Sequence, residues 1–354
     1  MIPQLGPAAA AVARFDGILS VVPNASILLS PLTTQEAVLS SRIEGTQATM
    51  GEVLEFEAEG GAIRENVPEA RRDDIQEVLN YRKAMFQAEK LLETLPLSQR
   101  LIRNIHGTLL DGVRGEGKAP GEYRRIPNWI GPAGCTVEGA RFVPISAEKL
   151  PNAMGQWEKF LHAEGQDRLV QLAILHAEFE ALHPFLDGNG RLGRMLVPLF
   201  LWQNKLLKRP MFYVSAYFER HRDEYYDRLL EVSRSDDWTG WCGFFLKSIQ
   251  NQAEENQAKA TAILELYERM KGRVVEITHS KYAILALDWI FGRPIFKSTD
   301  FVIGARIPEP SAKRILAVIR EEGLLKSMVV GRGRRASVFG FPELLNLVEG
   351  KTGF

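Results

Sequence analysis

A stretch of twelve residues, from His183 to Arg194, combines side chains that could act together on a phosphate group. The histidine can accept a proton near neutral pH. Asp187 offers a hard oxygen ligand to a divalent cation such as Mg²⁺. Arg191 and Arg194 lie three residues apart, so in a helix their guanidinium groups share a face and can bind phosphate oxygens. The stretch therefore predicts a polyphosphate site with a base beside it.

Glycine residues within the stretch permit the sharp backbone turn that such a site needs. Gly188 and Gly190 flank Asn189, and a backbone without Cβ atoms can approach a ligand closely. If a helix begins at Gly190, its first N–H groups point into the turn and form an anion site. Residues 188–193 also match the pattern GxGxxG, but a helix and His-Pro precede them and Tyr213 stands where an acid is needed. We therefore do not expect a dinucleotide fold.

The elements that position this stretch are expected to be helices. Apolar residues at helical spacing predict a helix over 167–182, which Pro184 ends, so His183 lies at a helix-to-loop junction. A second helix is expected from 190 to about 206, with Pro198 producing a kink. The same periodicity predicts further helices over 68–95, 97–111, 147–163, 219–234 and 237–270.

Two shorter segments show distinct patterns. Thr33 and Glu36 are typical of a capping box, and the helix that they begin would run to Glu44 and end at Gly45. Residues 129–144 are rich in Gly, Pro and Val, which predicts a short β-hairpin.

The composition changes after Gly272, and residues 280–354 carry 12 Lys/Arg against 7 Asp/Glu. Their pattern predicts helices over 281–291, 299–304 and 311–322, a short extended piece at 295–296, and two strands around 331–335, an order that suits a winged helix-turn-helix. The basic side chains that could contact DNA phosphates are Lys313, Arg314, Arg320, Arg332, Arg334 and Arg335. A protein partner is the alternative for this module.

Composition excludes several classes of protein. Lys plus Arg equals Asp plus Glu, so net charge indicates neither nucleic acid nor membrane as a partner of the whole chain. Two cysteines cannot build a disulfide framework, and a reducing, cytoplasmic compartment is expected. No apolar run of about 18 residues occurs, so no membrane association is expected. His176 and His183 lie seven apart without a third ligand, which disfavours a zinc site.

The stretch resembles the signature of the Fic family, His-x-Phe-x-(Asp/Glu)-Gly-Asn-Gly-Arg-x-x-Arg, at every specified position. Similarity to the family extends over about residues 30–250. The resemblance implies a mainly α fold, a Fic-type helical bundle with a small β-hairpin flap, to which the C-terminal winged helix is added. It also implies an enzyme that moves AMP from ATP to a Ser, Thr or Tyr hydroxyl of target proteins or of itself.

The same resemblance implies a role for each residue of the stretch. His183 would be the general base, Phe185 a core anchor and Asp187 the Mg²⁺ ligand. The ATP phosphates would lie against the segment Gly188, Asn189, Gly190, Arg191, Leu192, Gly193 and Arg194, with Arg191 at the β-phosphate and Arg194 at the γ-phosphate. From the residue types alone, Asp187 is equally a turn residue.

Two further features of the family concern the adenine and the target. Tyr226, and Tyr225 with it, would form the wall of the adenine pocket, although spacing alone fits core aromatics equally well. The flap at 129–144 would dock the target protein as an added strand.

The segment from Ser40 to Gly45 fits the inhibitory pattern of the family, (Ser/Thr)-x-x-x-Glu-(Gly/Asn). Ser40 and Glu44 are four apart and share a helix face. The resemblance implies that Glu44 reaches Arg194 and takes the place of the γ-phosphate contact. The alternative is an exposed glutamate whose surface pair contributes under about 1 kcal/mol. In some relatives this glutamate also serves AMP removal.

These patterns divide the chain into four parts: an N-terminal helical region at 1–95 with the inhibitory helix, a catalytic core at 96–250, a linker helix at 251–279, and the winged helix at 280–354. Transfer of another phosphate-containing group, or a DNA-binding regulator that senses nucleotide, are the competing functions. Intact Arg191, Arg194 and Asn189 favour ATP in the usual orientation, and His183 favours an enzyme. The sequence leaves a homodimer open.

Overall fold

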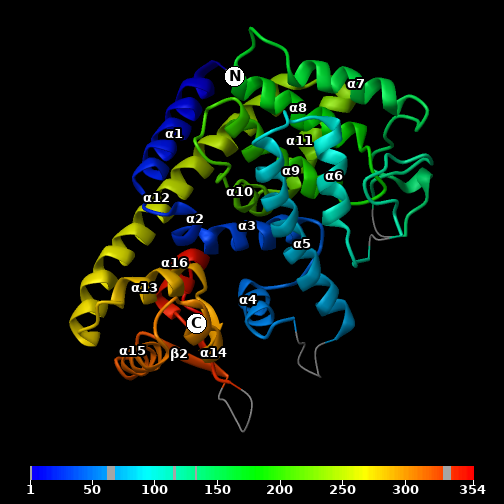
Figure 1. Cartoon of the computed structure of the whole chain (residues 1–354). Coiled ribbons are helices and arrows are strands. Elements are labelled where there is room, and N and C mark those ends of the chain that lie inside the picture. Colours follow the sequence, from blue (N-terminus) through cyan, green and yellow to red (C-terminus); the bar gives the residue numbers. More distant parts are fainter. Residues whose placement is uncertain (1, 62–67, 115–116, 132–133, 330–335) are drawn as a thin grey trace. The chain divides into compact units, whose positions relative to one another are not determined.

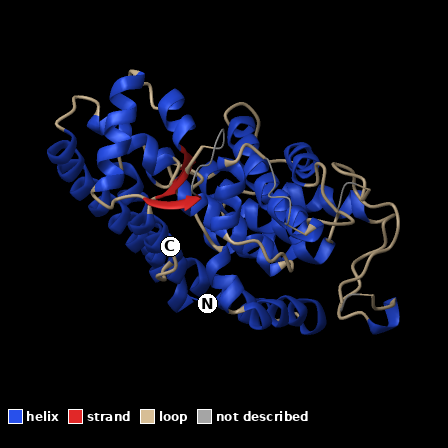
Figure 2. Ribbon diagram, turned by 90° about the horizontal axis from the view of Figure 1, so that it is seen from below, coloured by secondary structure: helices blue, strands red, loops and turns tan. Residues whose placement is uncertain are grey.

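The computed structural model describes residues 2–61, 68–114, 117–131, 134–329 and 336–354, and helices dominate these residues (Figure 2). The predicted mainly α class is confirmed. The chain forms two compact units, each assembled from separate segments: Met1–Asp16, Leu39–Thr46 and Gln76–Glu254 in the first, and Gly17–Val38, Gln47–Ile75 and Glu255–Phe354 in the second. The four-part division of the sequence stays a prediction.

The first unit is built around helix α9, Asn189–Gln203, which is buried along its length as far as Leu201. A helix that is buried on all sides requires neighbours on all sides. Helix α8, Arg168–Leu182, packs against α9, and α7 and α11 pack against α8. The other helices that contribute to this unit are α1 Ile2–Val21, α5 Glu69–Leu92, α6 Gln99–Leu109, α7 Leu150–Leu161, α10 Ser215–Arg220, α11 Arg222–Ser235 and α12 Trp238–Thr278.

Helix α9 contains Pro198, and the helix continues past it to Gln203. The helix predicted over 237–270 extends to Thr278 and therefore includes the predicted linker helix. Helix α1 was not expected from the sequence.

The second unit contains the C-terminal module, residues 280–354, whose helices and strands gather near the C-terminus (Figure 1). Its elements are α13 Ala283–Gly292, β1 Ile295–Lys297, α14 Ser298–Gly304, α15 Glu309–Glu321, β2 Lys326–Val329, β3 Val338–Gly340 and α16 Pro342–Glu349. The three strands are antiparallel in the order β1-β3-β2, with Ile295 opposite Gly340 and Lys326 opposite Gly340 on the other side.

The order of these elements is the one predicted, with the unpredicted α16 added, and assignment to the winged-helix class stays a prediction. The predicted phosphate contacts Arg332, Arg334 and Arg335 lie outside the described residues.

The predicted capping box at Thr33 is wrong. Helix α3 spans Ser30–Ile43, so Thr33 and Glu36 lie inside it, because Pro31 has the φ angle that suits the first turn of a helix and the helix begins there. The expected end is correct, since α3 stops at Ile43 and Gly45 has φ +106°.

A true capping box begins the following helix α4, Met50–Ala58. The Glu52 N–H donates to Thr49 Oγ1 at 3.3 Å, and the Thr49 N–H donates to Glu52 Oε2 at 2.8 Å.

The predicted hairpin at 129–144 is reduced to a single antiparallel bridge between Ile130 and Phe142 within the described residues. A 3₁₀ turn at Val137–Gly139 lies between the two bridged residues, and the Trp129 Nε1–H donates to the Cys135 carbonyl at 2.9 Å. Side-chain bonds and turns thus replace part of the strand ladder that the composition predicted. No helix in the described parts of the chain is long and apolar enough to cross a membrane.

The capping box generates a prediction for local stability. Thr49→Ala should weaken the start of α4 by about 1 kcal/mol, because the Glu52 N–H loses its acceptor. Hydrogen exchange of the α4 amides should then be about fivefold faster. Thr261→Ala, inside α12, should leave α4 exchange unchanged, and equal protection of α4 in the Thr49 variant and wild type would contradict the assigned cap.

Candidate active site

His183 stands where α8 ends, as predicted. Asp167 caps the start of α8 by accepting from the N–H groups of Leu169 and Val170 at 2.9 and 3.0 Å. At the other end, His183 has φ +46° and its N–H donates to the Phe179 carbonyl at 3.1 Å. The left-handed residue turns the chain out of the helix, and the imidazole lines a cavity.

The imidazole of His183 is in the form that a base requires. Burial is the main cause that lowers the pKa of His183 to about 4, so the ring is neutral at pH 7. Its Nδ1 lies 3.3 Å from the Glu180 carbonyl oxygen. Assigning the proton to Nδ1 makes this a hydrogen bond and leaves Nε2 as the acceptor.

Arg124 holds the backbone around His183, a role that sequence analysis did not assign. Its guanidinium donates to the carbonyls of His183 at 2.9 Å, Ile145 at 2.5 Å and Leu182 at 3.3 Å, and it is 2% exposed. The Arg124 N–H also donates to the Pro184 carbonyl at 2.9 Å. Carbonyls at a helix end lack intrahelical donors, and Arg124 supplies them and so fixes the base in place.

The turn after His183 is closed by Asn189. Its Oδ1 accepts from the Phe185 N–H at 2.9 Å, and its Nδ2 donates to the Phe185 carbonyl at 2.8 Å. Phe185 is fully buried and stacks on His106 with ring centroids 3.8 Å apart. The side chain of Asn189 thus shapes the turn, and the first N–H groups of α9 are left for an anion.

His106 holds the same turn from helix α6. Its Nδ1 accepts from the Gly121 N–H at 2.7 Å, so its proton lies on Nε2, which is 3.0 Å from the Asp187 carbonyl. Burial lowers the pKa of His106 to about 4, which agrees with this neutral tautomer.

The carboxylate of Glu44 lies at the N-terminus of α9, where the sequence predicted phosphate. A Cβ atom added to Gly190 would lie 2.2 Å from Glu44 Oε1 and 3.0 Å from Arg194 Nη1, so only glycine fits. Glu44 Oε1 accepts from Arg194 Nη2 at 2.6 Å. Burial acts to raise the pKa of Glu44, but the charge and hydrogen bond of Arg194 outweigh it and the pKa is lowered. The group is therefore an anion at neutral pH.

Arg194 is fully buried and receives a second partner from α3. Its Nε donates to Ser40 Oγ and its Nη2 donates to the Ser40 carbonyl, both at 2.9 Å. The structure thus brings together Ser40, Glu44 and Arg194 as the sequence predicted, and Gly45 ends the segment. Arg194 Nη1 is buried and has no partner among the described residues.

Arg191 is also buried, but its partners are different. Its Nη1 donates to Glu77 Oε2 at 3.0 Å and its Nη2 donates to Asp187 Oδ1 at 3.3 Å. Glu77, from α5, also binds Arg114 at 2.9 Å. The sequence predicted that both arginines bind one anion. In this structure they do not, because each guanidinium group binds its own carboxylates.

Asp187 remains suited to a metal that arrives with a nucleotide. Its Oδ1 also accepts from the Gly188 N–H at 2.5 Å, and its side chain is 41% exposed. Mg²⁺ is usually held by one or two carboxylates together with substrate phosphates. The parts of the chain that the structure describes contain no group of three or more His, Cys, Asp or Glu side chains that could hold a metal alone.

A cavity of about 420 Å³ opens beside His183, a size typical of ligand pockets. Glu44, Gly190 and Tyr226 line it together with Ile43, Ile130, Gly131, Arg141, Phe142, Ala177, Glu180, Ala181, Arg222, Asp223, Leu229, Leu230 and Ser233. The cavity is therefore lined by the predicted base, by the carboxylate predicted to be inhibitory and by one of the two predicted tyrosines.

Tyr225 does not line the cavity, so its place in the predicted adenine wall is wrong. It is fully buried, stacks on Phe218 with centroids 4.5 Å apart, and its OH lies 2.8 Å from His176 Nε2. On α11, neighbouring residues point in different directions, and Tyr225 takes the core side. Leu192 is likewise fully buried in the core, and Gly193 packs against Glu180.

Arg222, at the start of α11, connects the cavity wall with the segment that precedes Glu44. Its Nε donates to the Ile43 carbonyl at 3.1 Å, one residue before Glu44. The same guanidinium lies 5.4 Å from the centre of the Tyr226 ring. No local sequence pattern indicated this role for Arg222, because its partner Ile43 is 179 residues away.

Two family models match the chain. The one described as Fic/DOC family N-terminal matches residues 2–90, and the one described as Fic/DOC family matches residues 96–201. A probable protein adenylyltransferase of Aquifex aeolicus (strain VF5) is 28% identical over 205 residues, which are 58% of this chain and 56% of that protein. A protein adenylyltransferase Fic of Culex quinquefasciatus is 31% identical over 150 residues, which are 41% of this chain and 25% of that protein. The chain thus spans less than two thirds of the length of either relative.

Solved structures show the same fold. A Fic family protein from Desulfovibrio desulfuricans G20 has a TM-score of 0.59 at 19% identity and covers 96% of each chain. A Fic domain containing signaling protein from Bacteroides thetaiotaomicron VPI-5482 has a TM-score of 0.58 at 18% identity and covers 73% of this chain and 97% of that chain. At these identities the likeness confirms the fold alone.

The buried state of His106 predicts how stability depends on pH. Its pKa is about 4 when folded against about 6.5 in the free side chain, so the unfolded chain binds more protons between these values and stability is lost as pH falls from 6.5 towards 4. His106→Gln should lose less Tm between pH 7 and pH 5 than wild type does. Part of the loss should remain, because His183 and His176 also have lowered pKa values. Equal losses of Tm would contradict a neutral His106.

Proposed function

Since this chain belongs to the Fic/DOC family, we propose that it transfers AMP from ATP to a Ser, Thr or Tyr hydroxyl group of a protein, and that Glu44 inhibits this transfer. The observation that carries the proposal is a neutral imidazole and a helix N-terminus that line one cavity, with a carboxylate held where a phosphate would bind. The names of the relatives, which describe protein adenylyltransferases, support the same reaction.

In the proposed reaction, His183 accepts the proton and pyrophosphate is the leaving group. The target oxygen attacks the α-phosphorus, its O–H proton passes to Nε2 of His183, and the bond between the α-phosphorus and the bridging oxygen breaks to release pyrophosphate. Such transfers depend mainly on positioning and charge stabilisation. In the proposed reaction the phosphates would be held by the N–H groups of α9 and, once their carboxylate partners give way, by Arg191 and Arg194. Mg²⁺ bound by Asp187 and the phosphates would neutralise further negative charge.

Glu44 competes with this arrangement for the same groups. Its carboxylate covers Gly190 and binds Arg194 Nη2, so a γ-phosphate cannot contact either group while Glu44 stays in place. Charge-assisted bonds to a buried guanidinium are strong and geometrically specific. ATP that binds beside Glu44 would therefore carry its phosphates in a pose that the base cannot use.

The proposal predicts that Glu44→Gly raises AMP incorporation about 10- to 100-fold, because a bond to a charged group of about 1.5–3 kcal/mol no longer opposes the productive pose. Purified protein is incubated with Mg²⁺ and with ATP labelled at the α- or the γ-phosphorus. Label should enter protein from the α position alone. Adding His183→Ala to Glu44→Gly should lower the rate about 10²–10⁴-fold.

Glu164→Gly is the matched control, because Glu164 is exposed in the turn after α7 in the same unit. Its incorporation should equal that of wild type. Label from the γ position would show that the protein transfers phosphate and not AMP. Absence of label in every variant would contradict an enzyme and favour a nucleotide sensor.

The contact of Arg222 with the inhibitory segment gives a second prediction for the same assay. Arg222→Ala removes the donor to Ile43 O but leaves Glu44 and Arg194 intact, so inhibition should weaken by about three- to tenfold. Arg234→Ala, exposed on the same helix, is the control and should behave as wild type. If the Arg222 variant incorporates AMP at the wild-type rate, the hydrogen bond from Arg222 to the Ile43 carbonyl does not contribute to the position of Glu44.

A further inference from the structure

The C-terminal module contains two helices joined by a short turn, of the kind that places a helix in DNA. Helix α14 ends at Gly304 and α15 begins at Glu309, so residues 305–308 form the turn, with Arg306 at φ +55°. Two helices joined by a turn of three or four residues constitute a helix-turn-helix, whose second helix enters the major groove. One face of α15 is fixed in the core by Ala312, Ile315, Leu316 and Ile319.

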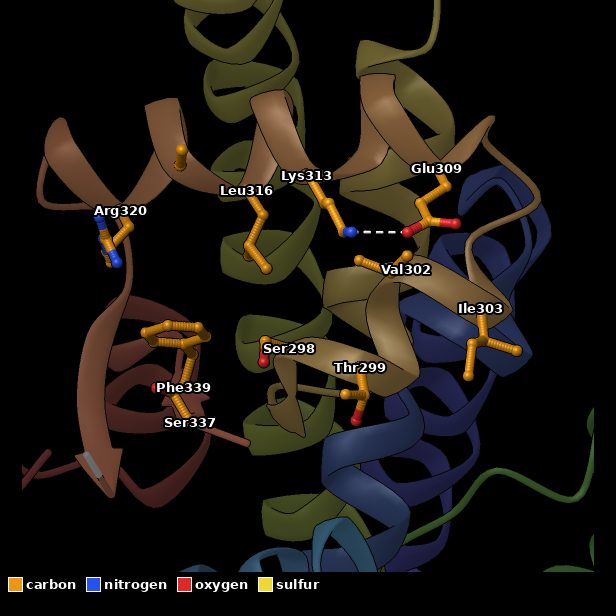
Figure 3. A pocket seen from close by; sticks show the side chains of 11 residues that line it. Ser298, Thr299, Val302, Ile303, Glu309, Lys313, Leu316, Arg320, Ser337 and Phe339 are labelled. Atoms are coloured by element: carbon orange, nitrogen blue, oxygen red, sulfur yellow. Dashed lines mark hydrogen bonds and ion pairs between the residues drawn. The ribbon is translucent and has the colours of Figure 1, made fainter. Parts of the chain in front are cut away.

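A groove of about 490 Å³ runs beside α15 (Figure 3). Lys313, Leu316, Ala317 and Arg320 line it from α15, and in Figure 3 the labelled side chains of α14, of β3 and of Ser337 just before β3 lie across from that helix. Those side chains include three hydroxyls, from Ser298, Thr299 and Ser337, beside the apolar Val302 and Phe339. The groove thus has two cations and the Glu309 carboxylate on the α15 side, and hydroxyl groups mixed with apolar side chains, among them Ile303, on the other.

The two cations of this wall are exposed and well separated. The side chains of Lys313 and Arg320 are 65% and 53% exposed. They are seven residues apart, which is about 10.5 Å along the helix axis and about the rise of three nucleotides in one DNA strand. A single small anion cannot bridge that separation, whereas a repeating polyanion meets both. Ala317 lies between them and is small enough to let the helix approach a surface closely.

Arg314 does not share this face, although the sequence analysis grouped it with Lys313 and Arg320. Its Nη1 donates to the carbonyl of Thr278 at 3.0 Å, at the end of α12. The basic face of α15 is therefore narrower than the sequence indicated, and Arg314 has a structural role.

We propose that this face of α15 binds duplex DNA, with Lys313 and Arg320 on phosphates and the helix facing the adjoining major groove. The charge of the module fits this partner, because residues 280–354 carry a surplus of five positive charges although the whole chain is neutral. The major groove, about 12 Å wide, admits a helix. The Glu309 carboxylate should weaken DNA binding, since it occupies Lys313 Nζ at 2.5 Å within the same groove.

The test uses the full chain and a fluorescein-labelled 30-base-pair duplex of random sequence, with anisotropy measured from 20 to 200 mM KCl. Wild type should bind, and log K should fall linearly with log[KCl]. Lys313→Ala and Arg320→Ala should each weaken binding about five- to tenfold at 0.1 M KCl and reduce the salt slope by about 0.9. Glu309→Ala should tighten binding, a change that a folding defect would not produce.

The control is Lys351→Ala, because Lys351 also pairs with a glutamate, Glu349, in the same module but does not line the groove. Its affinity and slope should match wild type. The proposal is overturned if the duplex does not bind at 20 mM KCl, or if the Lys313/Arg320 double variant keeps the wild-type slope. If a 30-residue polyglutamate binds with the same affinity as the duplex, the partner of this face is an acidic protein and not DNA.

Discussion

The burial of two guanidinium groups in one central helix is the constraint on which the first unit depends. Arg191 and Arg194 are 3% and 0% exposed, and α9 is surrounded on all sides. A buried cation without a partner carries a large desolvation penalty, so each arginine requires an anion within hydrogen-bond distance. Arg191 receives Glu77 and Asp187, and Arg194 receives Glu44. These pairs join the segment from Ser40 to Glu44, and Glu77 of α5, to α9 within the first unit.

Under the proposed function, this constraint would connect inhibition with activity. The anion beside Arg194 is Glu44 in this structure, and a nucleotide phosphate would have to replace it next to Gly190. The position of His183 is separate from this exchange, because its hydrogen bonds come from Arg124 and from the backbone. The proposal therefore implies that an inhibited molecule keeps its base in place, and that activation requires the replacement of one carboxylate.

Features whose causes lie close together in the sequence were predictable. Helix α8 and its end at His183 followed from apolar periodicity and Pro184, and Ser40 on α3 and Glu44 just after its end are only four residues apart. Features whose two halves lie far apart were not, because no local pattern pairs Arg124 with His183 across 59 residues or Arg191 with Glu77 across 114. Thr33 failed as a cap because Thr-x-x-Glu also occurs inside helices, and only the backbone decides between Thr33 and Thr49. Tyr225 and Tyr226 were indistinguishable by type, and the turn of α11 separates them.

The unpartnered Nη1 of Arg194 affects how firmly the resting state is held. A carboxylate has two oxygens, and the one that faces Arg194 engages Nη2. An oxygen of a terminal phosphate placed at Nη1 would supply the acceptor that this donor lacks. A buried donor left without an acceptor costs about 1–3 kcal/mol, and a ligand that supplies the missing acceptor recovers that energy. The contacts of Arg194 are thus incomplete at Nη1 among the described residues, and a phosphate that replaced Glu44 could meet both ends of the guanidinium fork.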